Sequence, residues 1–107
     1  MSTMQLDTRA SLRDTRNEIE PTAMRLIGML IFAAESPQEP GSSVFHKLRG
    51  MVARAAFPDS ALRIATHRAI AQAERYTTQD EPGAARYVLR LTAKRLATHA
   101  RRAARGA

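Results

Sequence analysis

The sequence contains no cysteine and no tryptophan, and aromatic residues make up only 5% of its 107 positions. The absence of cysteine excludes disulfide bonds, thiolate metal sites and cysteine nucleophiles, and it is consistent with a reducing compartment. Runs of β-branched and aromatic residues at period two, which indicate strands, are also missing. The core must therefore be built from Leu, Ile, Val, Met and twenty Ala residues, a composition that favours closely packed helices.

Features of export and of membrane insertion are missing as well. No N-terminal segment has the basic, apolar and small-residue layout of a signal peptide. The most apolar stretch, residues 23–34, has only twelve residues and includes Arg25, whereas a membrane span needs roughly twenty. We therefore expect a cytoplasmic protein with no membrane partner, in which residues 23–34 form a buried helix.

Residue patterns for catalysis are scarce. The three histidines, His46, His67 and His99, lack the i, i+4 spacing of metal ligands and have no adjacent carboxylate motif. The carboxylates are scattered, and no glycine-rich phosphate loop is present. We therefore expect that the protein is not an enzyme and has no catalytic residue, metal or cofactor. The alternative is a catalytic site assembled from residues that are distant in the sequence.

Hydrophobic periodicity predicts an all-α fold, a small antiparallel helical bundle of four to five helices in a single domain of residues 1–107. Residues 1–20 are polar and predict either a short helix or a flexible arm. The four long helices are expected at residues 22–35, 43–56, 60–76 and 80–104.

Local signals set the expected helix ends and buried faces. Ser42 or Ser43 is expected to cap the second long helix, and residues 57–60 separate it from the next. Thr78 and Glu81 have capping-box spacing for the last helix. The face predicted to be buried in the 60–76 helix consists of Leu62, Ala65, Ala69, Ala73 and Tyr76, with Ile70 at its edge.

The helix at 22–35 is apolar nearly all round, so it must be surrounded. It is expected to be the central core helix, or to form a homodimer interface through the segment Met24–Phe32. Gly28 either permits a close helix crossing or is tolerated at a cost of roughly 1 kcal/mol.

Charge is distributed unevenly along the chain, whose net charge is +7. Residues 1–40 hold four Arg and six acids and carry −2, whereas residues 41–107 hold eleven Arg, two Lys and four acids and carry +9. An asymmetry of this kind indicates an anionic partner for the second part. An Arg- and Ala-rich composition, typical of high-GC bacterial or phage genomes, explains the preference for Arg over Lys but not the scarcity of acids.

Cations in the last helix repeat on the side opposite its apolar residues. From Arg86 to Arg105 they cover about 28 Å at 1.5 Å per residue, and no acid follows Glu81. The 43–56 and 60–76 helices add further cations and could form a helix-turn-helix-like pair, with residues 60–76 as the reading helix. The candidate binding residues are Arg86, Arg90, Lys94, Arg101, Arg105, Arg63, Arg68, Arg75, Lys47 and Arg54.

We therefore expect a small basic binding protein that contacts nucleic acid in a regulatory role. Tyr76 and Tyr87 are expected to be partly buried, which favours duplex backbone contacts over base stacking. The alternative is an adaptor or inhibitor that docks its basic face on an acidic surface of a larger protein. A basic surface that is merely solvated is also open, whereas membrane-surface binding is disfavoured because the apolar side of the last helix is mostly Ala.

Overall fold

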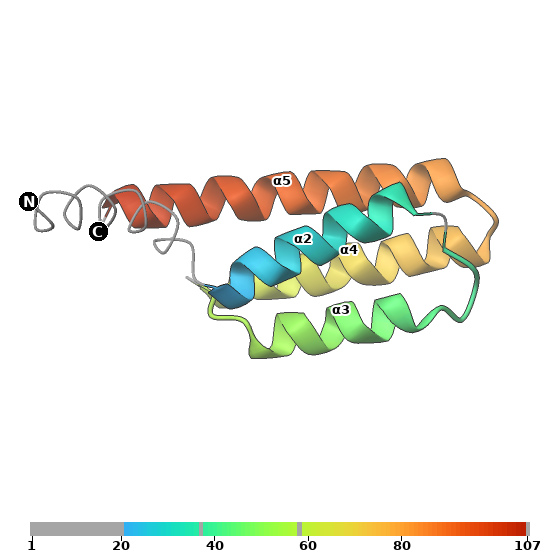
Figure 1. Ribbon diagram of the computed structural model, residues 1–107, viewed down its shortest axis with the longest axis horizontal. Helices are drawn as coiled ribbons and strands as arrows, with labels where there is room; N and C mark the ends of the chain where they lie inside the picture. The colour runs from blue at the N-terminus through green and yellow to red at the C-terminus, as the bar shows by residue number, and fades with distance from the viewer. Residues whose placement is uncertain (1–20, 37, 58, 107) are drawn as a thin grey trace, which may run out of the picture.

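The computed structural model describes residues 21–36, 38–57 and 59–106, and nearly all of these residues lie in helices. The helices are α2 (Pro21–Glu35), α3 (Ser43–Arg54), α4 (Ser60–Thr78) and α5 (Pro82–Gly106), and these three ranges contain no strand. Figure 1 shows the four helices lying lengthwise along one another in a bundle. The all-helical prediction is therefore confirmed, and the predicted helix at about 7–18 lies outside the described residues.

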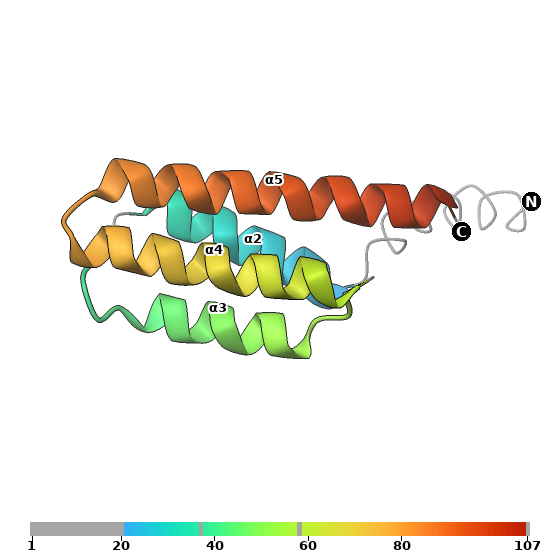
Figure 2. The ribbon, with the colours of Figure 1, turned by 180° about the vertical axis from the view of Figure 1, so that it is seen from behind.

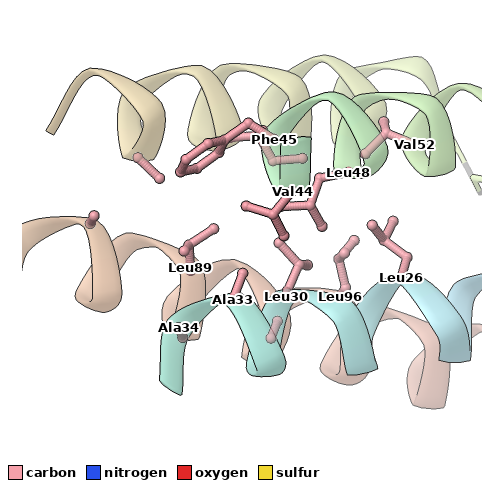
Figure 3. Packing of buried hydrophobic residues seen from close by; sticks show 14 of the residues in the cluster. Leu26, Leu30, Ala33, Ala34, Val44, Phe45, Leu48, Val52, Leu89 and Leu96 are labelled. Atoms are coloured by element: carbon pink, nitrogen blue, oxygen red, sulfur yellow. The ribbon is translucent and has the colours of Figure 1, made fainter. Parts of the chain in front are cut away.

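The arrangement places the longest helix along one edge of the bundle. In Figures 1 and 2, α5 and α3 form the two opposite edges, while α2 and α4 lie between them on the two faces. Both α2 and α4 pack against α5. Figure 3 shows Leu26 and Leu30 of α2 and Leu89 of α5 pointing toward the buried side chains of α3, among them Phe45. The core is therefore aliphatic, with one fully buried ring.

Two helix starts agree with the sequence. The Ser42 hydroxyl accepts a hydrogen bond from the Val44 amide at 3.3 Å, and an Asp59 carboxylate oxygen accepts one from the Leu62 amide at 2.7 Å. Each side chain thus satisfies one of the free N–H groups at a helix N-terminus. Ser42, rather than Ser43, is the cap of α3.

The capping box predicted for the last helix is wrong. Thr78 belongs to the last turn of α4, where its hydroxyl donates to the Glu74 carbonyl at 3.1 Å, and α5 begins at Pro82. Asp80 has φ of +59°, and the Glu81 amide donates to the Tyr76 carbonyl at 2.8 Å. A Schellman motif at a helix C-terminus usually has glycine in the left-handed position. Because Asp80 occupies that position here, the sequence did not indicate where α4 ends and α5 begins.

The buried face of α4 is rotated from the predicted one. Thr66, Ile70, Ala73 and Thr77 are buried, and Ile70 has no exposed surface, whereas Ala65 is exposed. The Thr66 and Thr77 hydroxyls donate to the carbonyls four residues earlier at 2.8 and 3.0 Å. Because this bond satisfies the hydroxyl locally, a threonine can face the core. The predicted face contained neither Thr66 nor Thr77, and it placed Ile70 only at its edge, so this prediction is wrong.

One face of α2 remains uncovered. Leu26 and Leu30 are buried, but Met24, Ile31 and Phe32 are 47%, 44% and 59% exposed. The expectation of a central core helix is therefore wrong for the described chain, and the alternative of a homodimer interface stays a prediction. A Cβ added to Gly28 would have no neighbouring heavy atom within 4 Å, so none of the described helices crosses α2 closely at this position. Among the described residues, no helix has the length and apolarity needed to cross a bilayer.

The rotated face of α4 predicts unequal costs for two identical truncations. Ile70→Ala removes a fully buried side chain and should lower the free energy of unfolding by about 3 kcal/mol. Ile64→Ala is the matched control in the same helix. Because Ile64 is 49% exposed, the loss there should stay below about 1 kcal/mol. Urea denaturation followed by circular dichroism measures both, and equal losses would contradict this orientation of α4.

Candidate anion-binding surface

The buried face of α5 fixes where its cations point. Ala85, Leu89, Ala93 and Leu96 are buried, and buried Thr92 donates its hydroxyl to the Val88 carbonyl at 2.7 Å. Residues that repeat at i, i+3 and i+4 share one side of a helix, so the cations outside this set turn to solvent. The exposed cations of the predicted row, here called the α5 basic row, are Arg86, Arg90, Lys94, Arg101 and Arg105.

No carboxylate neutralises the α5 basic row within the described chain. The ion pair found among these residues joins Arg49 of α3 to Glu74 of α4 at 2.6 Å. Helix α5 itself contains no acidic residue. The helix dipole favours cations only in the last turn, which accounts for Arg105 but not for Arg86 or Arg90. The row is therefore a solvent-facing line of charge without partners in residues 21–36, 38–57 and 59–106.

Helix α4 carries two further exposed cations. Arg68 and Arg75 lie seven residues, or about 10 Å, apart on one face of α4, and both are exposed. A shallow groove of about 350 Å³ runs between α4 and α5, with exposed Arg95 among its lining residues. Cations thus occur on both helices that border this groove.

Tyr87 corrects an expectation. Its side chain is 66% exposed and lines the α4–α5 groove, so the prediction that it is partly buried is wrong. Tyr76 is half-buried as expected, and its hydroxyl accepts a hydrogen bond from Gln72 at 3.3 Å. The missed signal was the spacing of Tyr87 and Lys94, which are seven residues apart and therefore on the same side of a helix.

Arg63 is engaged within the fold. Its guanidinium donates to the carbonyls of Val52, Ala53 and Ala55 at 3.2, 3.0 and 3.0 Å. It also lies 5.0 Å from the centroid of the Phe57 ring, within the range of a cation–π contact. The carbonyls at the end of α3 lack helical partners, so Arg63 holds this end of α3 against α4.

The remaining candidates lie away from the α5 basic row. Lys47 and Arg54 are exposed and seven residues apart on α3, which occupies the edge of the bundle opposite α5 in Figures 1 and 2. The ten candidate residues are thus divided between α5, α4 and α3 and do not form one continuous face.

Other parts of the described chain offer neither a metal-binding cluster nor a recess lined by cations. No group of three His, Asp or Glu side chains is placed to hold a metal ion. A recess of about 250 Å³ lies between α2, α5 and the connection before α4, lined mainly by Ala, Leu26, Phe57 and Leu96, with His99 as its polar side chain. Since no Lys or Arg lines this recess, it is not suited to hold an anion.

The contacts of Arg63 predict that Arg63 and Arg68, which lie five residues apart in α4, differ in their effect on stability. Arg63→Ala leaves three carbonyls without their charged donor and should reduce the free energy of unfolding by about 2 kcal/mol. Arg68→Ala is the control, with an expected change under about 0.5 kcal/mol because Arg68 is exposed. Thermal and urea unfolding check this, and the assignment fails if Arg63→Ala behaves like the control.

Comparisons of the chain with models of protein families, with curated proteins and with solved structures found no match. The surface is therefore interpreted from its own charges and geometry.

Proposed function

We propose that this protein binds nucleic acid through phosphate contacts along the α5 basic row. The observation that supports the proposal is the exposure of Arg86, Arg90 and Lys94 at four-residue intervals with no acidic neighbour in the described chain. Arginine suits this purpose because its planar guanidinium makes paired hydrogen bonds to phosphate oxygens. A row of such groups can contact several phosphates of one partner.

The length of the row favours a polymer over a small anion. The cations from Arg86 to Arg105 extend over about 28 Å along one straight helix. None of them is gathered with the others around an enclosed cavity among the described residues. A small anion needs several donors converging on one point, whereas a chain of phosphates presents charge at intervals. The extended row therefore matches a polyanion.

Repulsion between the cations of the row also favours a polyanionic partner. Like charges four residues apart weaken an isolated helix by a few tenths of a kcal/mol each, so the row slightly disfavours the free protein. A phosphate backbone beside α5 would replace this repulsion with attraction and would release the counterions condensed on the nucleic acid. Arg68 and Arg75 of α4 are exposed as well and add positive charge to the bundle.

A duplex is the form of nucleic acid that we propose. Single-strand binding proteins stack successive bases on several aromatic side chains, and Tyr87 is the one tyrosine that is largely exposed. One ring does not make a stacking platform, so contact with the backbone is favoured. We also propose a regulatory role, because binding through a helix face requires no chemical step.

The lengths of the connections bear on the direction in which neighbouring helices run. The connections between α2, α3, α4 and α5 are short, and short connections favour neighbouring helices that run in opposite directions. We propose an antiparallel bundle on this basis. Among the described residues, the cations of the α5 basic row are exposed in this bundle.

The alternative partner is an acidic surface on a larger protein, which the chain would cover as an adaptor or inhibitor. The same exposed cations would serve this partner. Binding of a nucleic acid duplex by the purified protein distinguishes the two partners.

Charge reversal of the row should abolish duplex binding. The variant Arg86→Glu/Arg90→Glu/Lys94→Glu replaces three exposed cations with anions, so it should remove the gel shift of a duplex at low salt while circular dichroism stays that of a folded helical protein. A shift that persists would exclude the row as the site. No shift by the unmodified protein at low salt would favour the acidic protein partner.

A matched pair of double variants tests the position of the site. Arg90→Glu/Lys94→Glu and Lys47→Glu/Arg54→Glu each exchange one Arg and one Lys for Glu, on opposite edges of the bundle. Charges more than a Debye length of about 10 Å apart are largely screened at 0.1 M salt. The α5 pair should therefore weaken binding strongly in a titration at that ionic strength, and the α3 pair should have little effect.

Salt dependence should report how many phosphates the row contacts. Each contact with duplex DNA contributes about −0.9 to the slope of log K against log salt concentration. The neutral variant Arg86→Gln/Arg90→Gln/Lys94→Gln should therefore reduce the magnitude of the slope by about 2.7. Fluorescence anisotropy at several salt concentrations measures this change, and an unchanged slope would show that the row does not contact phosphates.

A further inference from the structure

The outer face of α2 is apolar and lacks a cover in the described chain. Met24, Ile31 and Phe32 are about half exposed, and Gly28 lies between them without a side chain. Gly28, Ile31 and Phe32 follow Met24 by four, seven and eight residues, so the four positions form one continuous strip on the helix. In Figures 1 and 2, α2 lies on one outer face of the bundle, on the side opposite α4. The strip is therefore open to an approaching molecule.

Two charges stand at the ends of the strip. Arg25 lies near its start and Glu35 at its end, and both side chains are exposed. Neither takes part in an ion pair among the described residues. A surface with one cation, one anion and an apolar middle selects no strongly charged partner. It is complementary to itself when a second copy is turned end to end.

We propose that the occupant of this strip is α2 of a second copy of the chain, packed antiparallel to the first. Arg25 and Glu35 are equally distant from position 30, so a two-fold axis there brings Arg25 of each copy toward Glu35 of the other. The same axis places the Phe32 ring of each copy over the partner's Gly28. Interfaces in two-fold dimers use the same patch on both subunits, and this strip meets that requirement.

Glycine at position 28 is explained by this arrangement. A Cβ added there has open space around it among the described residues, so packing between them does not require glycine. Glycine inside a helix costs roughly 1 kcal/mol relative to alanine. In the antiparallel pair, the missing side chain leaves a depression that receives the ring of Phe32.

The seam is small, so the dimer should dissociate on dilution. A standard protein interface buries about 800 Å² on each partner, and a single helix face of 15 residues provides less. The pair does not involve the α5 basic row, and its test uses no nucleic acid. A result that excludes the dimer therefore does not bear on the proposed anion binding. A result that excludes anion binding likewise does not bear on the dimer.

Charge exchange tests the partner and its direction. Sedimentation velocity of the full chain over a range of concentrations should show a monomer–dimer equilibrium, and Phe32→Glu should weaken it at least about tenfold by placing a charge in the apolar seam. Arg25→Glu alone should weaken the dimer, as should Glu35→Arg alone, and the double variant Arg25→Glu/Glu35→Arg should recover it. Ile64→Glu, on the exposed face of α4, is the control that should leave the dimer unchanged.

Engineered cysteines test the register, since the natural chain has none. A mixture of Arg25→Cys and Glu35→Cys chains should form a mixed disulfide on oxidation. Either variant alone should not, because identical positions would lie about 15 Å apart along the antiparallel pair, too far for a disulfide. A protein that stays monomeric at high concentration overturns the proposal. A dimer that tolerates Phe32→Glu, or that links Arg25→Cys to itself, overturns it as well.

Discussion

The apolar packing of α5 determines which of its side chains face solvent. Leu89 and Leu96 are buried against the other helices, and burial of a leucine side chain contributes roughly 1.5–3 kcal/mol. Repulsion between like charges four residues apart costs only a few tenths of a kcal/mol per pair. The apolar contacts therefore decide how α5 is rotated about its axis, and the cations at Arg86, Arg90 and Lys94 have to face solvent.

The distribution of arginine shows why net charge alone does not locate a binding surface. Arg63 donates to three carbonyls at the end of α3, and Arg49 pairs with Glu74 across the α3–α4 contact. Both side chains hold helices together. In the described chain, the acids after residue 41 lie on or beside α4, and α5 has none. The charge available to a partner is therefore concentrated on the outer side of α5.

Much of the fold follows from periodicity and capping residues, and the errors have local causes. The apolar repeat of α3 and α5, the cap at Ser42 and the break at residues 57–60 could be found because these residues behave as their types usually do. The buried face of α4 could not, because Thr66 satisfies its own hydroxyl through a backbone carbonyl. The start of α5 was missed because Asp80 adopts a conformation that glycine usually takes. The row on α5 was predictable from spacing, whereas the internal role of Arg63 depends on tertiary contacts that spacing does not contain.

The exposed face of α2 follows from the size of the bundle. A helix apolar on every side needs neighbours all round, and α5 and α3 cover only the side that carries Leu26 and Leu30. A chain of this length buries a limited fraction of its surface. In the proposed dimer, the second copy would bury Phe32 and Ile31. The α2 strip and the α5 basic row share no residue. Dimer formation and anion binding would then use separate surfaces that the same four helices hold in place.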